Sequence, residues 1–109
     1  MDLAVEIYWL AAKFPHSEIC RLVAQITCAV ASVPANIAEG HARATRRGFA
    51  NFVAVAKGSL METETFLMLA IRLSCVTEVE ASRALGLITE ISKMLTALRS
   101  RLREAEKPE

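Results

Sequence analysis

The chain has 109 residues, of which 53% are apolar, and its 13 basic and 12 acidic side chains leave a formal net charge of +1. This length predicts a single domain, residues 1–109, and the near-neutral charge excludes a general attraction to nucleic acid, membranes or acidic substrates. A domain of this size buries only about 60–65% of the surface that its unfolded chain exposes. We therefore expect some apolar faces to be buried against other subunits.

The cysteines and the N-terminal segment indicate a reducing compartment. Cys20, Cys28 and Cys75 include no CxxC pair, so they predict neither a disulfide framework nor a zinc site. The N-terminal run LAVEIYWLAA is interrupted by Glu6 and lacks a basic leader, which argues against a signal peptide. With no stretch of about 18 uncharged apolar residues, we expect a cytoplasmic protein without a membrane partner.

The first two expected helices cover about residues 2–13 and 17–39. Asp2 is a candidate N-cap of the first helix, and Pro15 ends it because the residue before proline avoids helical geometry. In the second helix Pro34 removes one hydrogen bond, which predicts a kink. Both helices carry apolar residues at helical spacing: Leu3, Ile7, Leu10 and Phe14, then Ile19, Leu22, Val23, Ile26, Val30, Val33 and Ile37.

A polar face lies opposite the apolar stripe of the second helix, and it leads into a structural corner. Gly40 there suits the left-handed residue that closes a helix. Asn36 and Glu39 have two interpretations: they hold the turn that Pro34 opens, which we favour, or they bind a ligand. The residues of this face and corner are Gln25, Ser32, Pro34, Asn36, Glu39 and Gly40.

Three arginines follow the corner. If the helix continues past Gly40, then Arg43 lies one turn beyond Glu39 and pairs with it. If the helix ends at Gly40, then Arg43 belongs to the corner with Arg46 and Arg47. In either case these arginines are candidates for binding nucleic acid or a partner.

The third expected helix covers about residues 46–74, with Thr45 as its cap. Gly58 inside the helix predicts close approach by a neighbour, and with Ser59 and Glu62 it forms a candidate interface. Glu62 either pairs with an arginine, such as Arg43 of the same or a neighbouring subunit, or lies at an exposed edge. Two apolar rows run along the helix: Phe49, Val53, Ala56, Leu60, Thr63, Leu67 and Ala70, and Phe52, Val55, Ser59, Glu62, Phe66, Leu69 and Leu73.

The fourth expected helix covers about residues 78–105 and begins with the capping box Thr77-Glu78-Val79-Glu80. Short connections make neighbouring helices antiparallel, so the prediction is an all-α, up-and-down four-helix bundle. Its apolar row is Ala84, Ile88, Ile91, Leu95, Leu98, Leu102 and Ala105. Its basic residues, of which Arg101 lies on another face, are Lys93, Arg99, Arg101 and Arg103.

Several of these segments together resemble a bacterial four-helix-bundle family. They are FPHSEICRL, Gln25, SVPANIAEG, Arg43, Phe49, Phe52 and AKGSLMETE. The family is known from open reading frames in intervening sequences of 23S ribosomal RNA genes and carries the label S23 ribosomal protein. It is similar to the accessory protein of diversity-generating retroelements, a pentamer that works with reverse transcriptase and RNA. The resemblance implies a ring-like homo-oligomer, a homopentamer, with RNA or a nucleic-acid-processing protein as a partner.

The chain departs from the family pattern after Gln25. Thr27 and Cys28 stand where the family usually has two arginines, and Gly48 replaces an acidic residue. The lost arginines weaken the expectation of RNA binding without affecting the fold.

The sequence offers no catalytic, metal or cofactor constellation. His16 and His41 do not follow a glutamate by three residues, as a di-metal bundle site requires, and no GxSxG motif is present. We therefore expect a non-enzymatic homo-oligomeric scaffold, accessory to an RNA or ribonucleoprotein process and binding through Arg43, Arg46, Arg47, Lys93, Arg99 and Arg103. The alternative is a scaffold for proteins with no role in nucleic-acid binding.

Overall fold

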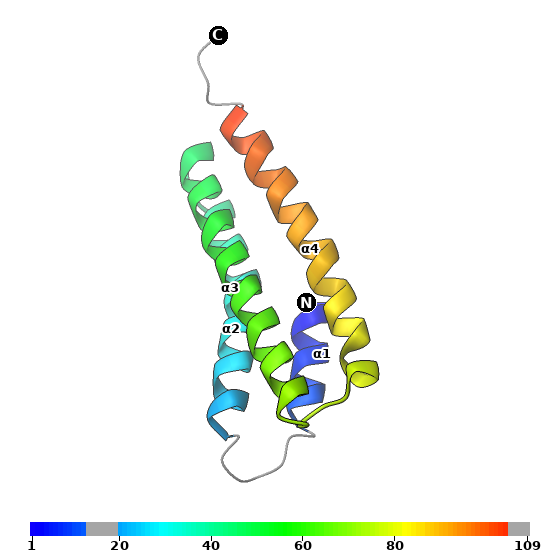
Figure 1. Cartoon of the computed structure of the whole chain (residues 1–109). Coiled ribbons are helices and arrows are strands. Elements are labelled where there is room, and N and C mark those ends of the chain that lie inside the picture. Colours follow the sequence, from blue (N-terminus) through cyan, green and yellow to red (C-terminus); the bar gives the residue numbers. More distant parts are fainter. Residues whose placement is uncertain (13–19, 105–109) are drawn as a thin grey trace.

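The computed structural model describes residues 1–12 and 20–104, apart from the side chains of Cys20 and Arg21. This part of the chain is all-α, as predicted, and contains no strand. Residues 13, 17–19 and 105 of the expected helices lie outside the described part. The helices, shown in Figure 1, are α1 (Asp2–Ala11), α2 (Cys20–His41), α3 (Arg46–Arg72) and α4 (Glu78–Glu104).

The helices alternate in direction and surround a common core, in a body of 55 × 21 × 18 Å (Figure 1). Helix α1 contacts α2 and α4, while α3 contacts α2 and α4 on its two sides. Because α1 has only 10 residues, it accompanies one half of the long helices, and the other half is built from α2, α3 and α4 (Figure 1). The largest fully buried side chains include Ile7, Ile26, Leu60, Leu67 and Ile88, so every helix contributes to the core.

The two apolar rows of α3 lie in different environments. The first row faces the core, where Leu60 and Leu67 have no exposed surface. The second row is mostly exposed or half-buried, with Val55, Leu69 and Leu73 in contact with solvent. Helical spacing thus predicted both rows, and the single chain buries one of them.

The helix caps follow the sequence at two of three places. The Thr45 hydroxyl accepts a hydrogen bond from Gly48 N at 3.0 Å. In the capping box, Thr77 Oγ1 accepts from Glu80 N at 3.1 Å and Glu80 Oε1 accepts from Thr77 N at 3.0 Å. The expectation for Asp2 was wrong, because Met1 occupies the N-cap and Asp2 already lies in the first turn. There its negative charge interacts favourably with the positive end of the helix dipole.

Helix α3 ends earlier than the expected residue 74, at Arg72. Ser74 adopts a left-handed conformation with φ of 60°. Cys75 N donates to Ala70 O at 2.9 Å and Ser74 N donates to Ile71 O at 3.0 Å, which is the Schellman arrangement of a helix end. The chain thus turns into α4 at a serine, although glycine is the usual residue in this conformation.

Both glycine predictions were wrong. Gly40 is helical, since no glycine has a positive φ, and α2 continues to His41. A Cβ at Gly40 would lie 2.7 Å from Phe52 Cβ and 3.0 Å from Phe49 Cδ1, so this glycine permits close packing of α2 on α3. The close approach expected at Gly58 is not found, because a Cβ there would meet nothing within 4 Å.

Length and composition alone would allow one described segment, Leu22–His41, to cross a membrane. This differs from the expectation that no segment reaches that size. In the structure the same segment buries Leu22, Ile26 and Val30 in the protein core.

Candidate functional site

The polar face of α2 meets α3 through a small hydrogen-bond network. Ser32 Oγ and Ser59 Oγ lie 2.9 Å apart, and Asn36 Nδ2 donates to Ser32 Oγ and to Ser32 O, both at 2.8 Å. The carbonyl that Pro34 deprives of its usual donor belongs to Val30, so Asn36 does not satisfy it in the predicted way. The network instead ties α2 to α3.

A groove of about 430 Å³ opens beside this network, between α2 and α3. Gln25 and Glu62 are exposed, so both side chains are accessible from solvent. The residues that line this α2–α3 groove are Ala24, Gln25, Cys28, Ala29, Ser32, Ser59, Glu62 and Phe66. The groove therefore brings together Gln25, Ser32, Ser59 and Glu62, and its described lining contains one carboxylate and no basic side chain.

The residues of the predicted corner lie in two different places. Arg43 Nη2 donates to Glu39 Oε1 at 2.6 Å, as expected for a helix that continues past Gly40. The Arg43 guanidinium also lies 4.8 Å from the centre of the Phe52 ring. Arg43 thus has a partner in its own chain, and Glu62 is not that partner. Pro34 lines a separate apolar cavity of about 210 Å³ between α1, α2 and α4.

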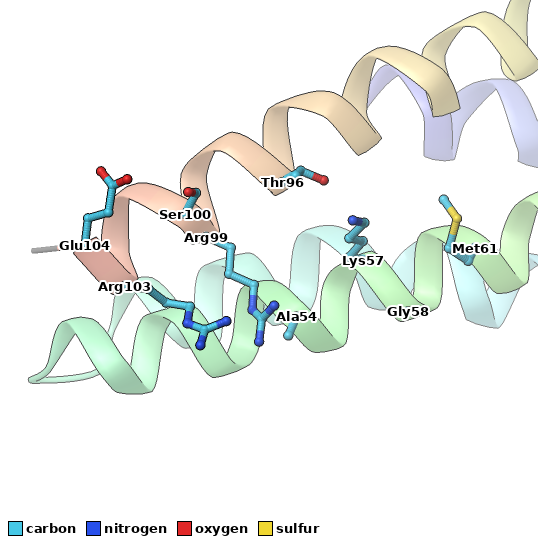
Figure 2. Close-up of a pocket in the computed structure, with 9 residues that line it drawn as sticks. All are labelled: Ala54, Lys57, Gly58, Met61, Thr96, Arg99, Ser100, Arg103 and Glu104. Carbon is cyan, nitrogen blue, oxygen red and sulfur yellow. The ribbon is translucent and has the colours of Figure 1, made fainter. Parts of the chain in front are cut away.

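The candidate basic residues are not brought to one place. Arg46 and Arg47 are exposed at the start of α3, and Lys93 is exposed on α4. Arg99 and Arg103 line a groove of about 690 Å³ between α3 and α4 (Figure 2). The residues that line this α3–α4 groove are Ala54, Lys57, Gly58, Met61, Thr96, Arg99, Ser100, Arg103 and Glu104.

Sequence analysis missed Lys57, which places a third cation in the α3–α4 groove. The signal was present as a third face of α3, because Lys57 and Gly58 each lie three or four residues from both Ala54 and Met61. This face is neither uniformly apolar nor uniformly charged. A search for apolar stripes and basic runs therefore passes over it.

The described residues contain no group of three or more His, Cys, Asp or Glu side chains that could hold a metal ion. Cys28 is an exposed free thiol and Cys75 is a buried one. The ring of His41 contacts the ring of Phe49 edge-on, with 5.8 Å between ring centres. The described side chains of the two grooves offer hydrogen-bonding groups, charges and, at Cys28, a thiol.

Comparison with protein families identifies the family of this chain. The model of the 23S rRNA-intervening sequence protein family matches residues 1–97, which covers α1, α2, α3 and most of α4. The chain belongs to this family. The match confirms the resemblance carried by SVPANIAEG and AKGSLMETE, and it extends into α4, for which the quoted segments gave no resemblance.

A solved structure of a family relative has the same fold. It is a protein of unknown function from the S23 ribosomal protein family of Bacteroides thetaiotaomicron, 28% identical in sequence, with a TM-score of 0.80. The superposition covers 90% of this chain and 92% of the relative. No protein with a curated description matches the chain. The comparisons therefore establish fold and family and leave the activity to be inferred from the surface.

Proposed function

We propose that this family member is a non-enzymatic homo-oligomeric scaffold that assembles through the exposed row of α3 and serves an RNA or ribonucleoprotein process. The observation that carries the proposal is the row itself. Val55, Leu69 and Leu73 are each about half exposed in the single chain, and Phe66 is half-buried beside them. The exposed charge of Glu62 interrupts the row between Val55 and Phe66. Beyond it, Phe66, Leu69 and Leu73 form an apolar strip of the kind that is typical of a subunit interface.

A second apolar surface supports assembly. Helix α1 buries Leu3, Ile7 and Leu10 but leaves Tyr8 and Trp9 outside, and Trp9 is 71% exposed. Large aromatic side chains are enriched at protein interfaces. Two different apolar surfaces on one protomer allow head-to-tail contacts, which close into a ring when the rotation permits. The proposal has three further parts: the oligomer is a pentamer, α2 bends at Pro34, and the protein is located in the cytoplasm.

Light scattering at micromolar concentration tests the assembly. We expect a mass several times the 11.9 kDa of one chain, and about five times for a pentamer. The variant Leu69→Asp/Leu73→Asp places two carboxylates in the row and should yield smaller species, because burying unpaired charges is costly. Val79→Asp is the control for an added surface carboxylate, since Val79 is 82% exposed on α4 and is not part of the row. A wild-type chain that runs as a folded monomer would refute the scaffold.

The α2–α3 groove favours the alternative of a protein scaffold. Among the described side chains that line it, Glu62 is the only charged one, so we expect it to repel phosphates and accept a basic or neutral segment of a protein. Affinity purification under nuclease treatment distinguishes the two roles. A stoichiometric protein partner that remains after nuclease and is lost in Glu62→Lys would establish the alternative.

A further inference from the structure

The α3–α4 groove concentrates positive charge that the net charge of the chain conceals. Lys57 contributes from α3, whereas Arg99 and Arg103 contribute from α4. Figure 2 shows both guanidinium groups reaching from α4 toward α3, while the carboxylate of Glu104 points away from α3. The groove therefore has a cationic interior although the whole chain carries a net charge of only +1.

These cations lack counter-ions within the part of the chain that the structure describes. The ion pairs found there join Arg43 to Glu39 and Arg83 to Glu6, both outside the groove. The Nε of Arg99 is shielded from water and has no hydrogen-bond partner among the described residues. A buried donor without an acceptor is unfavourable and calls for a partner. An oxygen ligand in the groove would supply one once the Arg99 side chain turns its Nε toward the groove.

The arrangement of the charges is itself unfavourable without an anion. Arg99 and Arg103 are separated by one helical turn, a rise of about 6 Å along α4, and like charges at this spacing repel each other. The negative end of the α4 dipole favours Arg103 in the last turn. That dipole does not explain Lys57, which approaches the same groove from the middle of another helix.

The floor of the groove is low and open. It is formed by Ala54, Gly58 and Met61, and at Gly58 even a Cβ would meet no atom within 4 Å. None of the described side chains that line the groove is aromatic, so they offer bases no ring to stack on. A protein partner would require large apolar pockets, whereas this floor offers only Met61. The groove therefore suits a flexible chain of anions.

We propose that the α3–α4 groove binds the phosphates of a single-stranded polynucleotide through Lys57, Arg99 and Arg103, without sequence preference. The planar fork of each arginine pairs with two phosphate oxygens, and lysine acts as a point charge. This inference rests on the proposed RNA-linked function and gives it a site. The groove and the exposed apolar row lie on different flanks of α3, so assembly leaves the groove available and repeats it in every subunit.

Fluorescence anisotropy with a short labelled polyuridylate tests the groove. For the wild type at about 50 mM salt we expect binding that weakens steeply with salt, because phosphate contacts release counterions. Arg99→Gln/Arg103→Gln should lower affinity on the order of tenfold and flatten the logarithmic salt slope by about 1.4 per occupied groove. Arg72→Gln/Arg101→Gln removes two charges from exposed positions outside the groove and should change both quantities much less.

Two further measurements cover misfolding of the double variant and the kind of polyanion that the groove accepts. Lys57→Gln changes the groove from α3 and should act in the same direction, which covers the case in which the double arginine variant fails to fold. Polythymidylate should bind like polyuridylate, because the groove reads phosphates and not the 2′-hydroxyl, and polyglutamate should bind far more weakly.

Equal losses in the groove and control variants would overturn the proposed site, as would stronger binding of polyglutamate than of polyuridylate. Absence of polynucleotide binding by the wild type would overturn it as well. The mass from light scattering is measured independently, so the scaffold can survive the loss of the groove.

Discussion

Helix α3 has two helical neighbours, and its two contacts differ. Against α2 it packs closely, with Gly40 lying against Phe52 and a hydrogen bond between Ser32 and Ser59. Against α4 the contact opens, toward the end that α1 does not reach, into a groove of about 690 Å³ around Gly58 (Figures 1 and 2). The contact with α2 is thus close at Gly40 and leaves the smaller groove, of about 430 Å³, whereas the contact with α4 leaves the larger one.

The difference shows that glycine has opposite uses in the same bundle. At Gly40 the missing side chain lets two helices approach, as a small residue at a helix contact allows. At Gly58 the missing side chain keeps a groove floor low. The surroundings of each glycine, and not its place in the helix, decide what a methyl group would do.

The largest effect is expected from exchanging these glycines for alanine. Gly40→Ala would place a Cβ 2.7 Å from Phe52 Cβ, and overpacking of this kind costs about 1–3 kcal/mol. Gly58→Ala should stabilise the protein by up to about 1 kcal/mol, because alanine is the better helix former. Urea unfolding of both variants checks the sign. A Gly40→Ala variant as stable as Gly58→Ala would show that α2 and α3 adjust their spacing freely.

A smaller effect is expected from the hydroxyl pair on the tight side. Ser32→Ala or Ser59→Ala removes the 2.9 Å contact between the helices, and a buried hydrogen bond contributes about 0.5–1.5 kcal/mol. A double-mutant cycle isolates the pair, since the double variant should cost less than the two single changes combined. Thr65→Ala is the control, because Thr65 Oγ1 donates to Met61 O within the exposed face of the same helix. If the changes in unfolding free energy of the two single variants add up to that of the double variant, the contact between the two hydroxyls contributes nothing to stability.

Much of the fold could be predicted from the sequence because its signals are local. The row from Val53 to Ala70, the Thr45 cap and the capping box at Thr77 each depend on residues within a turn or two of each other. The left-handed residue could not be placed in the same way. Gly40 has the residue type that prefers this conformation, but the packing of Phe49 and Phe52 against it keeps it in the helix. The left-handed conformation is found at Ser74 instead.

The candidate site was predicted only in parts, because a groove requires two helices in register. Sequence spacing placed Arg99 and Arg103 on one face of α4, and the structure keeps them together. Sequence spacing could not show that Lys57 lies beside these arginines, since its position relative to them depends on where α3 crosses α4. Nor could it show that Glu62 and Arg43 find different surroundings, with Arg43 already bound to Glu39.

The smallest effect is expected at Thr63, the fully buried polar residue of the inward row of α3. Its hydroxyl donates to Ser59 O at 2.8 Å, a carbonyl that also receives the usual backbone bond of the helix. Thr63→Val therefore leaves no buried acceptor without a donor, and we expect a change of less than about 1 kcal/mol. Thr63→Ser keeps the hydroxyl but removes a buried methyl group, which costs about 1 kcal/mol. Thermal unfolding of the two variants should rank valine above serine, because packing, and not the hydroxyl, holds this position between the tight and open sides of α3. The reverse ranking would mean that the hydrogen bond from the hydroxyl to Ser59 O, and not the buried methyl group, holds this position.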